Sequence, residues 1–177
     1  ENAIFWIRGR KPQLIPELCN GCMACQLVCK SGAIVAVRQE VGRFFVNEVE
    51  RDMILITGVS DVGITETSPI VDWTKRKTVE IARERGYDTI VFDLPPGMHC
   101  NVVKALMGCE LAYAVTEPTP LGTYDLEQAL KLAKRLGIEV RVVLNKSGCG
   151  DRTRIENLVK NFDVRIDVEI PYDRRIT

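Results

Sequence analysis

The sequence predicts an α/β protein whose main part is a mostly parallel, doubly wound sheet, preceded by a small separate domain. Two observations support this fold class. From about residue 53 onward, runs of β-branched and apolar residues alternate with amphipathic helical stretches. Gly or Asp stands at most of the junctions between these segments. Strands and helices that alternate in this way form right-handed crossovers and a largely parallel sheet.

Five strands and four helices are expected in this main part. The strands are predicted over residues 53–59, 88–94, 111–117, 138–146 and 164–171. The first helix is expected to begin at Asp72 and to run to Arg85, with Gly86 as its C-terminal stop. A short helix is predicted over 99–107, and the next one ends at Gly137. Its apolar stripe consists of Leu126, Ala129, Leu130, Ala133 and Leu136. The stripe of the last helix consists of Ile155, Leu158, Val159 and Phe162.

Residues 1–50 do not follow this alternation and are expected to form a small domain that ends near Asn47. Within it, the stretch AIVAVRQEVGRFFVN (33–47) holds two short β-prone pieces on either side of residues 40–42, which predict a hairpin. The expected division is therefore a small domain at 1–50 and an α/β domain at 51–177.

The composition excludes several classes of function. Of the 177 residues, 46% are hydrophobic, which is enough for one sizeable core. Lys plus Arg and Asp plus Glu both number 24, so no net charge favours nucleic acid or an anionic membrane. No uncharged apolar stretch approaches the ~20 residues of a membrane span, and the start lacks the order of a signal peptide. The predicted location is the cytoplasm, where thiols stay reduced.

The seven cysteines therefore indicate metal rather than disulfides. Four of them form the run CNGCMACQLVC, in which Cys19, Cys22, Cys25 and Cys29 are spaced as C-x2-C-x2-C-x3-C. Such short spacers allow thiolates of one tight loop to converge on a 4Fe-4S cluster. Structural zinc also takes four cysteines, although usually as two C-x2-C pairs a dozen or more residues apart. Zinc and incidental cysteines are the alternatives to the iron–sulfur interpretation.

The run resembles a bacterial-type ferredoxin, whose motif continues with Pro after the last Cys and a small-residue turn before a strand. Here Lys30 replaces that Pro, while SGAIV (31–35) keeps the small residues. In such ferredoxins the fourth Cys of a run serves the other cluster. The resemblance thus leaves two possibilities, in which Cys29 completes the same cluster or a second run lies outside this chain. The remaining cysteines at 100, 109 and 149 are expected to be small buried residues of the α/β part rather than ligands.

A second candidate site lies where the predicted strand 88–94 ends. The stretch IVFDLPPGMHC places Asp93 at the carboxyl end of that strand, where open α/β sheets bind ligands. A carboxylate at this position holds Mg2+ through water, and the amide of Gly97 is free to approach a phosphate. The alternative is a strand-ending Asp that caps the next turn, with Pro95 and Pro96 as turn residues.

Residues that suit a purine base follow two later strands. Asn145 ends the predicted strand 138–146, and its amide both donates to and accepts from a purine edge. Pro171 and Tyr172 follow the last strand and suit packing against a base. Each also has an ordinary structural interpretation: Asn145 as a turn residue, and Pro171 and Tyr172 as the place where the chain leaves the sheet. Their joint occurrence at successive strand ends favours a nucleotide site.

These strand ends resemble the MinD/ParA/Mrp family of P-loop ATPases, in particular its members with an inserted ferredoxin domain. The likeness rests on the acid-x-Pro-Pro-Gly turn at 93–97, Thr-Glu-Pro-Thr at 116–119, Asn-Lys at 145–146 and Pro-Tyr-Asp at 171–173. It implies ATP or ADP with Mg2+ as ligands, and Asp93 as the catalytic acid that orients water and Mg2+. It further implies that Gly97, preceded by Pro96, senses the γ-phosphate and that Asn145 and Pro171 contact adenine.

One part of the family pattern is absent from the sequence. No G-x-x-x-x-G-K-[ST] loop is present, and the nearest Gly-rich piece is KSGCGDRT (146–153). Phosphoryl transfer depends on the positioning that such a loop supplies. ATP hydrolysis is therefore expected only if an upstream half supplies the loop, and the start at Glu1 predicts that the chain is a piece of a longer protein.

The leading hypothesis is an iron–sulfur, MinD-like ATP-binding protein that couples nucleotide-driven conformational change or dimerisation to a 4Fe-4S cluster. The cluster would serve redox sensing, electron transfer or the handling of metal clusters. This hypothesis predicts a homodimer and a redox or metalloprotein partner, with neither nucleic acid nor a membrane span. The alternatives are a non-catalytic ferredoxin-type electron-transfer module and an iron–sulfur assembly carrier.

Overall fold

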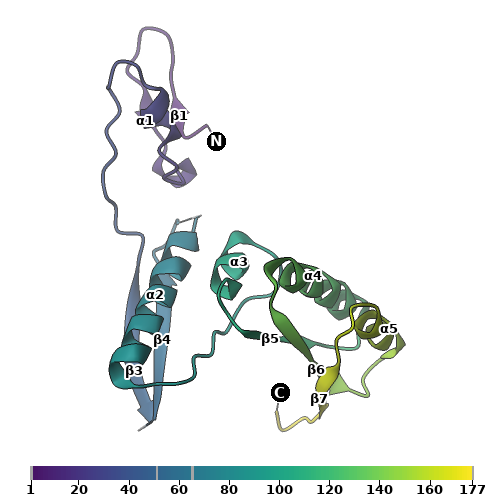
Figure 1. Ribbon diagram of the computed structural model, residues 1–177. Helices are drawn as coiled ribbons and strands as arrows, with labels where there is room; N and C mark the ends of the chain where they lie inside the picture. Colours follow the sequence, from purple (N-terminus) through teal and green to yellow (C-terminus); the bar gives the residue numbers. More distant parts are fainter. Residues whose placement is uncertain (1, 51, 65, 177) are drawn as a thin grey trace. The chain divides into compact units, whose positions relative to one another are not determined.

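The computed structural model describes residues 2–50, 52–64 and 66–176. The chain divides into two compact units, Glu1–Ile90 and Val91–Thr177, and most of their helices and strands are labelled in Figure 1. None of the helices in the described ranges is both long and apolar enough to cross a membrane.

The first unit begins with small elements around the cysteine run. Strand β1 (Ile4–Phe5) pairs antiparallel with β2 (Gln13–Leu14). A single 3-10 turn, η1 (Pro16–Leu18), and the short helix α1 (Ala24–Val28) follow. Between residues 2 and 41, all of which are described, no residue is buried. This segment therefore has no hydrophobic core of its own.

The next element of the first unit is an antiparallel hairpin. Strand β3 (Gly42–Glu50) pairs with β4 (Met53–Ser60) over most of its length, from Gly42 opposite Ser60 to Glu50 opposite Met53. Antiparallel strands need only a short link, so β4 pairs with the β-prone stretch just before it.

This hairpin corrects two predictions. The hairpin expected around residues 40–42 was placed wrongly, because residues 33–41 contain no strand and β3 begins at Gly42. The strand expected at 53–59 exists, but it is largely exposed and antiparallel rather than buried in a parallel sheet. The predicted domain division at 50/51 follows the last residue of β3 and stays a prediction.

Helix α2 (Ser68–Arg85) packs on one face of the hairpin. The rings of Phe44 and Trp73 meet edge to face at 4.6 Å between centroids. Gly58 of β4 lies so close to α2 that an added Cβ would overlap the Thr74 hydroxyl. Close approach of strand and helix therefore requires glycine at this position.

The boundaries of α2 confirm one expected end and correct the other. The helix stops at Gly86, whose φ of 76° is left-handed and favours glycine. It begins at Ser68 rather than at Asp72. The carboxylate of Glu66 accepts a hydrogen bond from the Ser68 backbone N–H at 2.8 Å, so the side chain of Glu66 satisfies a free N–H of the first turn.

The strand predicted over residues 88–94 does not form. These residues have no regular secondary structure, and the side chain of Val91 is 87% exposed. The apolar run IVF has strand propensity, but a strand also needs a neighbour that pairs with its backbone groups. The strand prediction is wrong because it rested on propensity alone.

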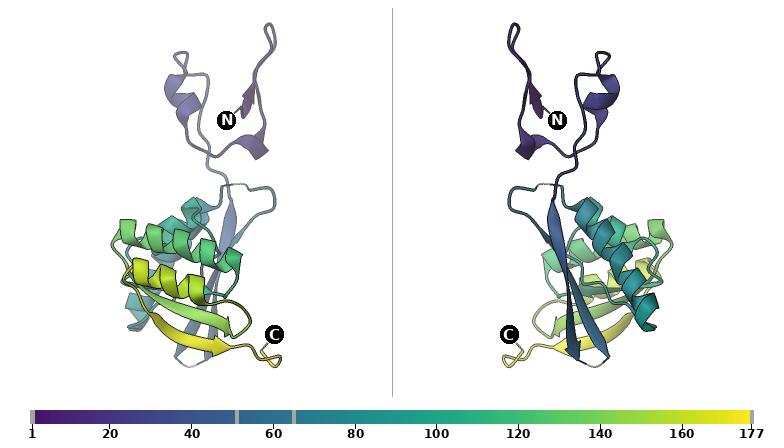
Figure 2. Two further views of the ribbon diagram at one scale, coloured as in Figure 1. Left: turned by 90° about the vertical axis from the view of Figure 1, so that its right-hand side faces the viewer. Right: turned by 90° about the vertical axis from the view of Figure 1, so that its left-hand side faces the viewer.

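The second unit contains a parallel sheet in the order β5-β6-β7. Its strands are β5 (Leu111–Thr116), β6 (Glu139–Ser147) and β7 (Ile166–Pro171). Its helices are α3 (Cys100–Leu106), α4 (Pro120–Leu136) and α5 (Thr153–Asn161). Figure 2 shows α4 and α5 side by side over one face of the sheet. The predicted strands and helices of this region are confirmed to within a few residues.

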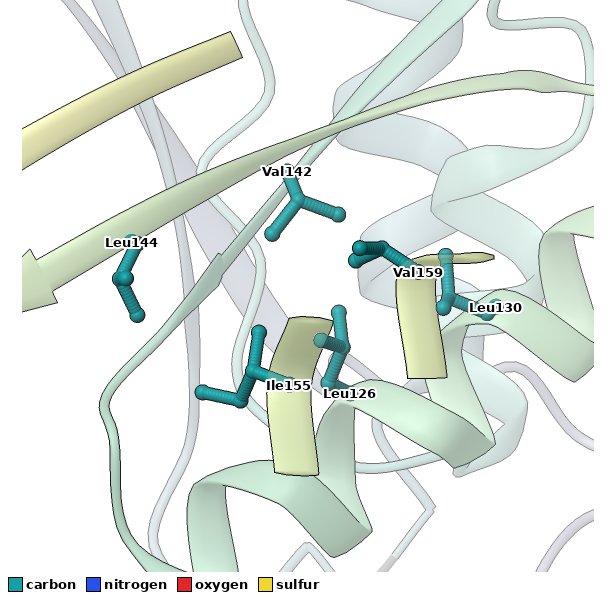
Figure 3. Packing of buried hydrophobic residues seen from close by; sticks show 6 residues of the cluster. All are labelled: Leu126, Leu130, Val142, Leu144, Ile155 and Val159. Atoms are coloured by element: carbon teal, nitrogen blue, oxygen red, sulfur yellow. The ribbon is translucent and has the colours of Figure 1, made fainter. Parts of the chain in front are cut away.

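The core of the second unit lies between α4, α5 and the sheet. Figure 3 shows its six buried side chains, which are Leu126, Leu130, Val142, Leu144, Ile155 and Val159. The opposite face of β5 is open, with Tyr113 52% and Val115 67% exposed. The fold is thus a mixed α/β arrangement with small sheets, and the described residues do not confirm a doubly wound sheet.

Candidate functional site

The four cysteines of the run lie on the loop and short helix that follow β2. Cys19 ends η1, Cys25 lies in α1, and Cys29 follows the last residue of α1. Cys19 and Cys22 are exposed, whereas Cys25 and Cys29 are half-buried. All seven cysteines lie among the described residues and are free thiols. Cys100 and Cys149 are exposed and Cys109 is half-buried, so the expectation that these three are buried was wrong. Thiols are available as thiolate ligands only when they are not in disulfides.

The backbone of this loop turns sharply between the cysteines. Gly21 and Met23 both have left-handed conformations, with φ of 71° and 62°. The side-chain oxygen of Asn20 accepts a hydrogen bond from the Cys22 N–H at 3.1 Å, which is a local Asx turn. These turns explain how four thiols fit into so short a stretch.

A second turn, residues 29–34, surrounds the sulfur of Cys29 and is called the Cys29 turn below. The hydroxyl of Ser31 lies 3.4 Å from this sulfur. The Ser31 side chain is the largest cause of a lowered pKa of Cys29, followed by the backbone N–H of Ala33. The N–H groups of Ile34 and Ser31 act in the same direction. Hydrogen bonds to a thiolate favour the charged form of the sulfur, which is the form that binds metal.

The donor chemistry of the run fits an iron–sulfur cluster, because four free thiols of one exposed loop match the ligands that such clusters use. In the described ranges, no three Cys, His, Asp or Glu side chains stand close enough together to hold one metal ion. The sulfurs would therefore have to draw together as iron and sulfide bind, which is common where a metal site forms during folding. The assignment of individual ligands stays a prediction.

Comparison with known protein families bears on the same segment. Residues 12–35 match the 4Fe-4S binding domain. The match supports an iron–sulfur domain of ferredoxin type, as the cysteine spacing predicted. It also supports an electron-transfer type of role, which is compatible with the ferredoxin-type module given above as an alternative. The resemblance of the remaining chain to MinD-type ATPases stays a prediction.

Two uncharacterized proteins of Methanocaldococcus jannaschii are similar to this chain beyond the ferredoxin-type segment. The first is 31% identical over 176 residues, which are 99% of this chain and 58% of the relative. The second is 28% identical over 158 residues, which are 89% of this chain and 52% of the relative. The chain thus spans about half the length of the curated relatives it matches.

The predicted acid and its turn lie in an irregular stretch. Asp93, Pro96 and Gly97 are all exposed, in the segment between α2 and α3. Gly97 has a φ of 100°, so this position favours glycine whatever its function. Within the described ranges, no hydrogen bond or ion pair links these three residues to Asn145 or Pro171. The assignment of these residues to one nucleotide site with Asn145 and Pro171 stays a prediction.

The later strand ends, in contrast, meet at one edge of the sheet. In the ladder between β6 and β7, Asn145 lies opposite Ile170 and Ser147 opposite Pro171. Asn145 and Pro171 are therefore neighbours on adjacent strands, as parallel pairing requires. The residue after Asn145 is Lys146, whose φ of 49° is unusual for a lysine.

An ion pair that the sequence analysis did not single out lies at this edge. The Nζ atom of Lys146 is 2.8 Å from Oε1 of Glu117, the residue after β5. The hydrogen bond to Glu117, followed by its charge, raises the pKa of Lys146. Gly150 approaches the same edge so closely that an added Cβ would overlap the Pro118 carbonyl oxygen. Only the order of the strands in the sheet brings residues 117 and 146 together, so sequence spacing carried no signal for the pair.

Proposed function

We propose that residues 12–35 hold one 4Fe-4S cluster on Cys19, Cys22, Cys25 and Cys29 and act as an electron-transfer module. The observation that carries this proposal is the C-x2-C-x2-C-x3-C run within the segment that matches the 4Fe-4S binding domain. When bound, such a cluster accepts and donates single electrons.

The surroundings of the cysteines suit exchange of electrons with another protein. Cys19 and Cys22 are exposed, and so are Leu27 and Val28 of α1, at 84% and 75%. A cluster on this loop would lie at the surface of its segment, within reach of a partner. Exposed apolar residues beside such a site favour a protein partner over a small ion.

The test is anaerobic reconstitution of the chain with iron and sulfide. We expect brown visible absorbance and about four iron atoms per chain for a 4Fe-4S cluster. Cys22→Ser should lose most of the iron, because the ligand is removed. Cys100→Ser is the matched control, since Cys100 is also exposed but lies outside the run.

Two results would contradict the electron-transfer proposal. A wild-type chain that binds one zinc atom and no iron would make the run a structural zinc site. A cluster that passes to an apo-ferredoxin without any redox cycle would favour the assembly-carrier alternative. Reversible bleaching by dithionite, with the iron retained, supports electron transfer.

A second function is favoured by the strand-end geometry. We propose that the edge formed by Glu117, Asn145, Lys146 and Pro171 binds the adenine end of ATP or ADP and couples nucleotide to the cluster. The supporting observations are the neighbouring positions of Asn145 and Pro171 and the adjoining ion pair. In this proposal Asp93, Pro96 and Gly97 serve the phosphates and Mg2+, and ATP hydrolysis requires a phosphate-binding loop supplied by further sequence.

The nucleotide proposal is tested by NMR titration of this chain with ADP. We expect shifts concentrated at residues 117, 145, 146 and 171, and their loss in Asn145→Ala. Asn161→Ala, at the end of α5, is the matched control that should leave them unchanged. Shifts that are absent, or spread evenly over the chain, would contradict the proposal.

A further inference from the structure

The Cys29 turn places one side-chain hydroxyl against a cysteine sulfur. The Oγ atom of Ser31 lies 3.4 Å from Sγ of Cys29, within hydrogen-bond distance for sulfur. The turn is closed by the Gly32 N–H, which donates to the Cys29 carbonyl oxygen at 3.1 Å. The sulfur of Cys29 thus lies against the Ser31 hydroxyl within one closed turn.

Local sequence explains this geometry. Gly32 has a left-handed φ of 64°, which allows the chain to turn back over the sulfur. Ser31 is the second residue after Cys29, the last cysteine of the run, and its short side chain therefore lies beside Cys29. Because the serine side chain is short, its contact with the sulfur fixes few rotatable bonds and costs little side-chain conformational entropy.

We propose that Ser31 is a positioning residue that donates a hydrogen bond to the Cys29 sulfur and thereby raises the reduction potential of the cluster. This inference rests on the proposed iron–sulfur function. Either atom of the pair is able to donate while Cys29 is a thiol. Once the sulfur is a thiolate bound to iron it only accepts, so the proton of the hydrogen bond must come from Ser31.

The direction of the effect follows from charge. Reduction adds one electron, supplied here by dithionite, and transfers no proton to the sulfur. The reduced cluster is more negative, so a hydrogen-bond donor at a ligand sulfur stabilises it more than the oxidised cluster. Loss of the Ser31 hydroxyl should therefore make the cluster harder to reduce.

The test compares Ser31→Ala and Ser31→Val with Ser31→Thr in the reconstituted full chain. The readout is the midpoint potential from a mediated redox titration followed by EPR. In Ser31→Ala and Ser31→Val, the ratio of reduced to oxidised cluster at a fixed potential should fall by about three- to tenfold. For one electron, this corresponds to a midpoint potential that is lower by ~28 to ~59 mV. Ser31→Thr keeps the hydroxyl and should retain the wild-type potential.

The comparison between Ser31→Val and Ser31→Thr separates loss of the hydroxyl from a change in side-chain shape. The two new side chains have nearly the same shape and differ in the hydroxyl. Ser60→Ala, at the end of β4, is a control without a cysteine contact. Equal potentials for the Val and Thr variants would overturn the role of Ser31 while leaving the electron-transfer proposal intact. A wild-type chain without any cluster would instead overturn the proposed function and this inference with it.

Discussion

At the scale of single residues, the pair of Lys146 and Glu117 gives the clearest expectation. Glu117→Gln should lower the pKa of Lys146 towards that of an ordinary lysine, because the negative charge that strengthens the hydrogen bond and attracts the ammonium group is lost. A lysine with a raised pKa contributes stability at pH values below its ordinary pKa, and this stability is lost as pH rises through the raised value. NMR titration of the Lys146 side chain measures the shift.

The same variant should change the thermal midpoint little. Both side chains of the pair are more than one third exposed, at 38% and 37%, so solvent screens their attraction. Glu127→Gln is the matched control, because Glu127 pairs with Lys131 on α4 at 2.7 Å and should leave Lys146 unaffected. An unchanged Lys146 pKa in Glu117→Gln would show that the pair is not formed in solution.

At the scale of elements, the start of α4 depends on one side chain. The hydroxyl oxygen of Thr119 accepts a hydrogen bond from the Gly122 N–H at 3.0 Å and so caps the helix. Thr119→Ala should lower the free energy of unfolding by about 1 kcal/mol, measured by urea denaturation. Thr123→Ala is the control: it also removes a hydroxyl in the first turn, but one that donates to the Thr119 carbonyl and caps nothing. Equal losses in the two variants would contradict the capping role.

The hairpin and α2 give a second expectation at this scale. Gly58→Ala should destabilise their packing by about 1 to 3 kcal/mol, because the new methyl group overlaps the Thr74 hydroxyl. That hydroxyl is buried and has no hydrogen-bond partner among the described residues. In a Thr74→Ala background, the cost of Gly58→Ala should therefore fall, and a double-mutant cycle by urea denaturation measures the coupling. Additive costs would mean that strand and helix do not meet at this point.

The elements that were predicted correctly are those in which local pattern and packing agree. Helix α4 has an apolar stripe at helical spacing and a left-handed glycine at its end, and its stripe covers the sheet. Residues 88–94 have strand propensity but form no strand, and no property of the segment itself reveals this. The β3–β4 pairing likewise depends on which strand lies beside β4 in the folded chain and not on the pattern of β4 itself.

At the scale of the whole molecule, the two ends of the chain should respond differently to iron. Residues 2–41 bury no side chain, and a segment of about 40 residues without a core usually needs metal or disulfides to be stable. Residues 111–171 have a core of six buried apolar side chains. Their stability should not depend on the cluster.

Hydrogen exchange with and without reconstituted iron measures this difference. We expect amide protection in 12–35 to rise on iron binding, because metal binding and folding are coupled there. Protection over β5 to β7 should stay the same, and these strands provide the internal control. Full protection of 12–35 in the iron-free chain would contradict the coupling.

By itself, the sequence determined the chemistry of the cysteine run and most elements after residue 100. Both depend on short-range information: four thiols within one loop suit an iron–sulfur cluster wherever the loop lies, and a helical stripe is visible within 17 residues of α4. The prediction for Asp93 and Gly97 rests on the same local grounds, but the strand expected at 88–94 does not form.

Only the tertiary structure decided which distant residues become neighbours. Contacts between segments produce the antiparallel pairing of β3 with β4, the ion pair between Glu117 and Lys146, and the layer of α4 and α5 over β5 to β7. The side-chain pattern of a strand shows which of its faces is apolar. It does not show which other strand will pair with the backbone groups along the edge of that strand. That neighbour is a property of the folded chain, which is why local propensity did not reveal it.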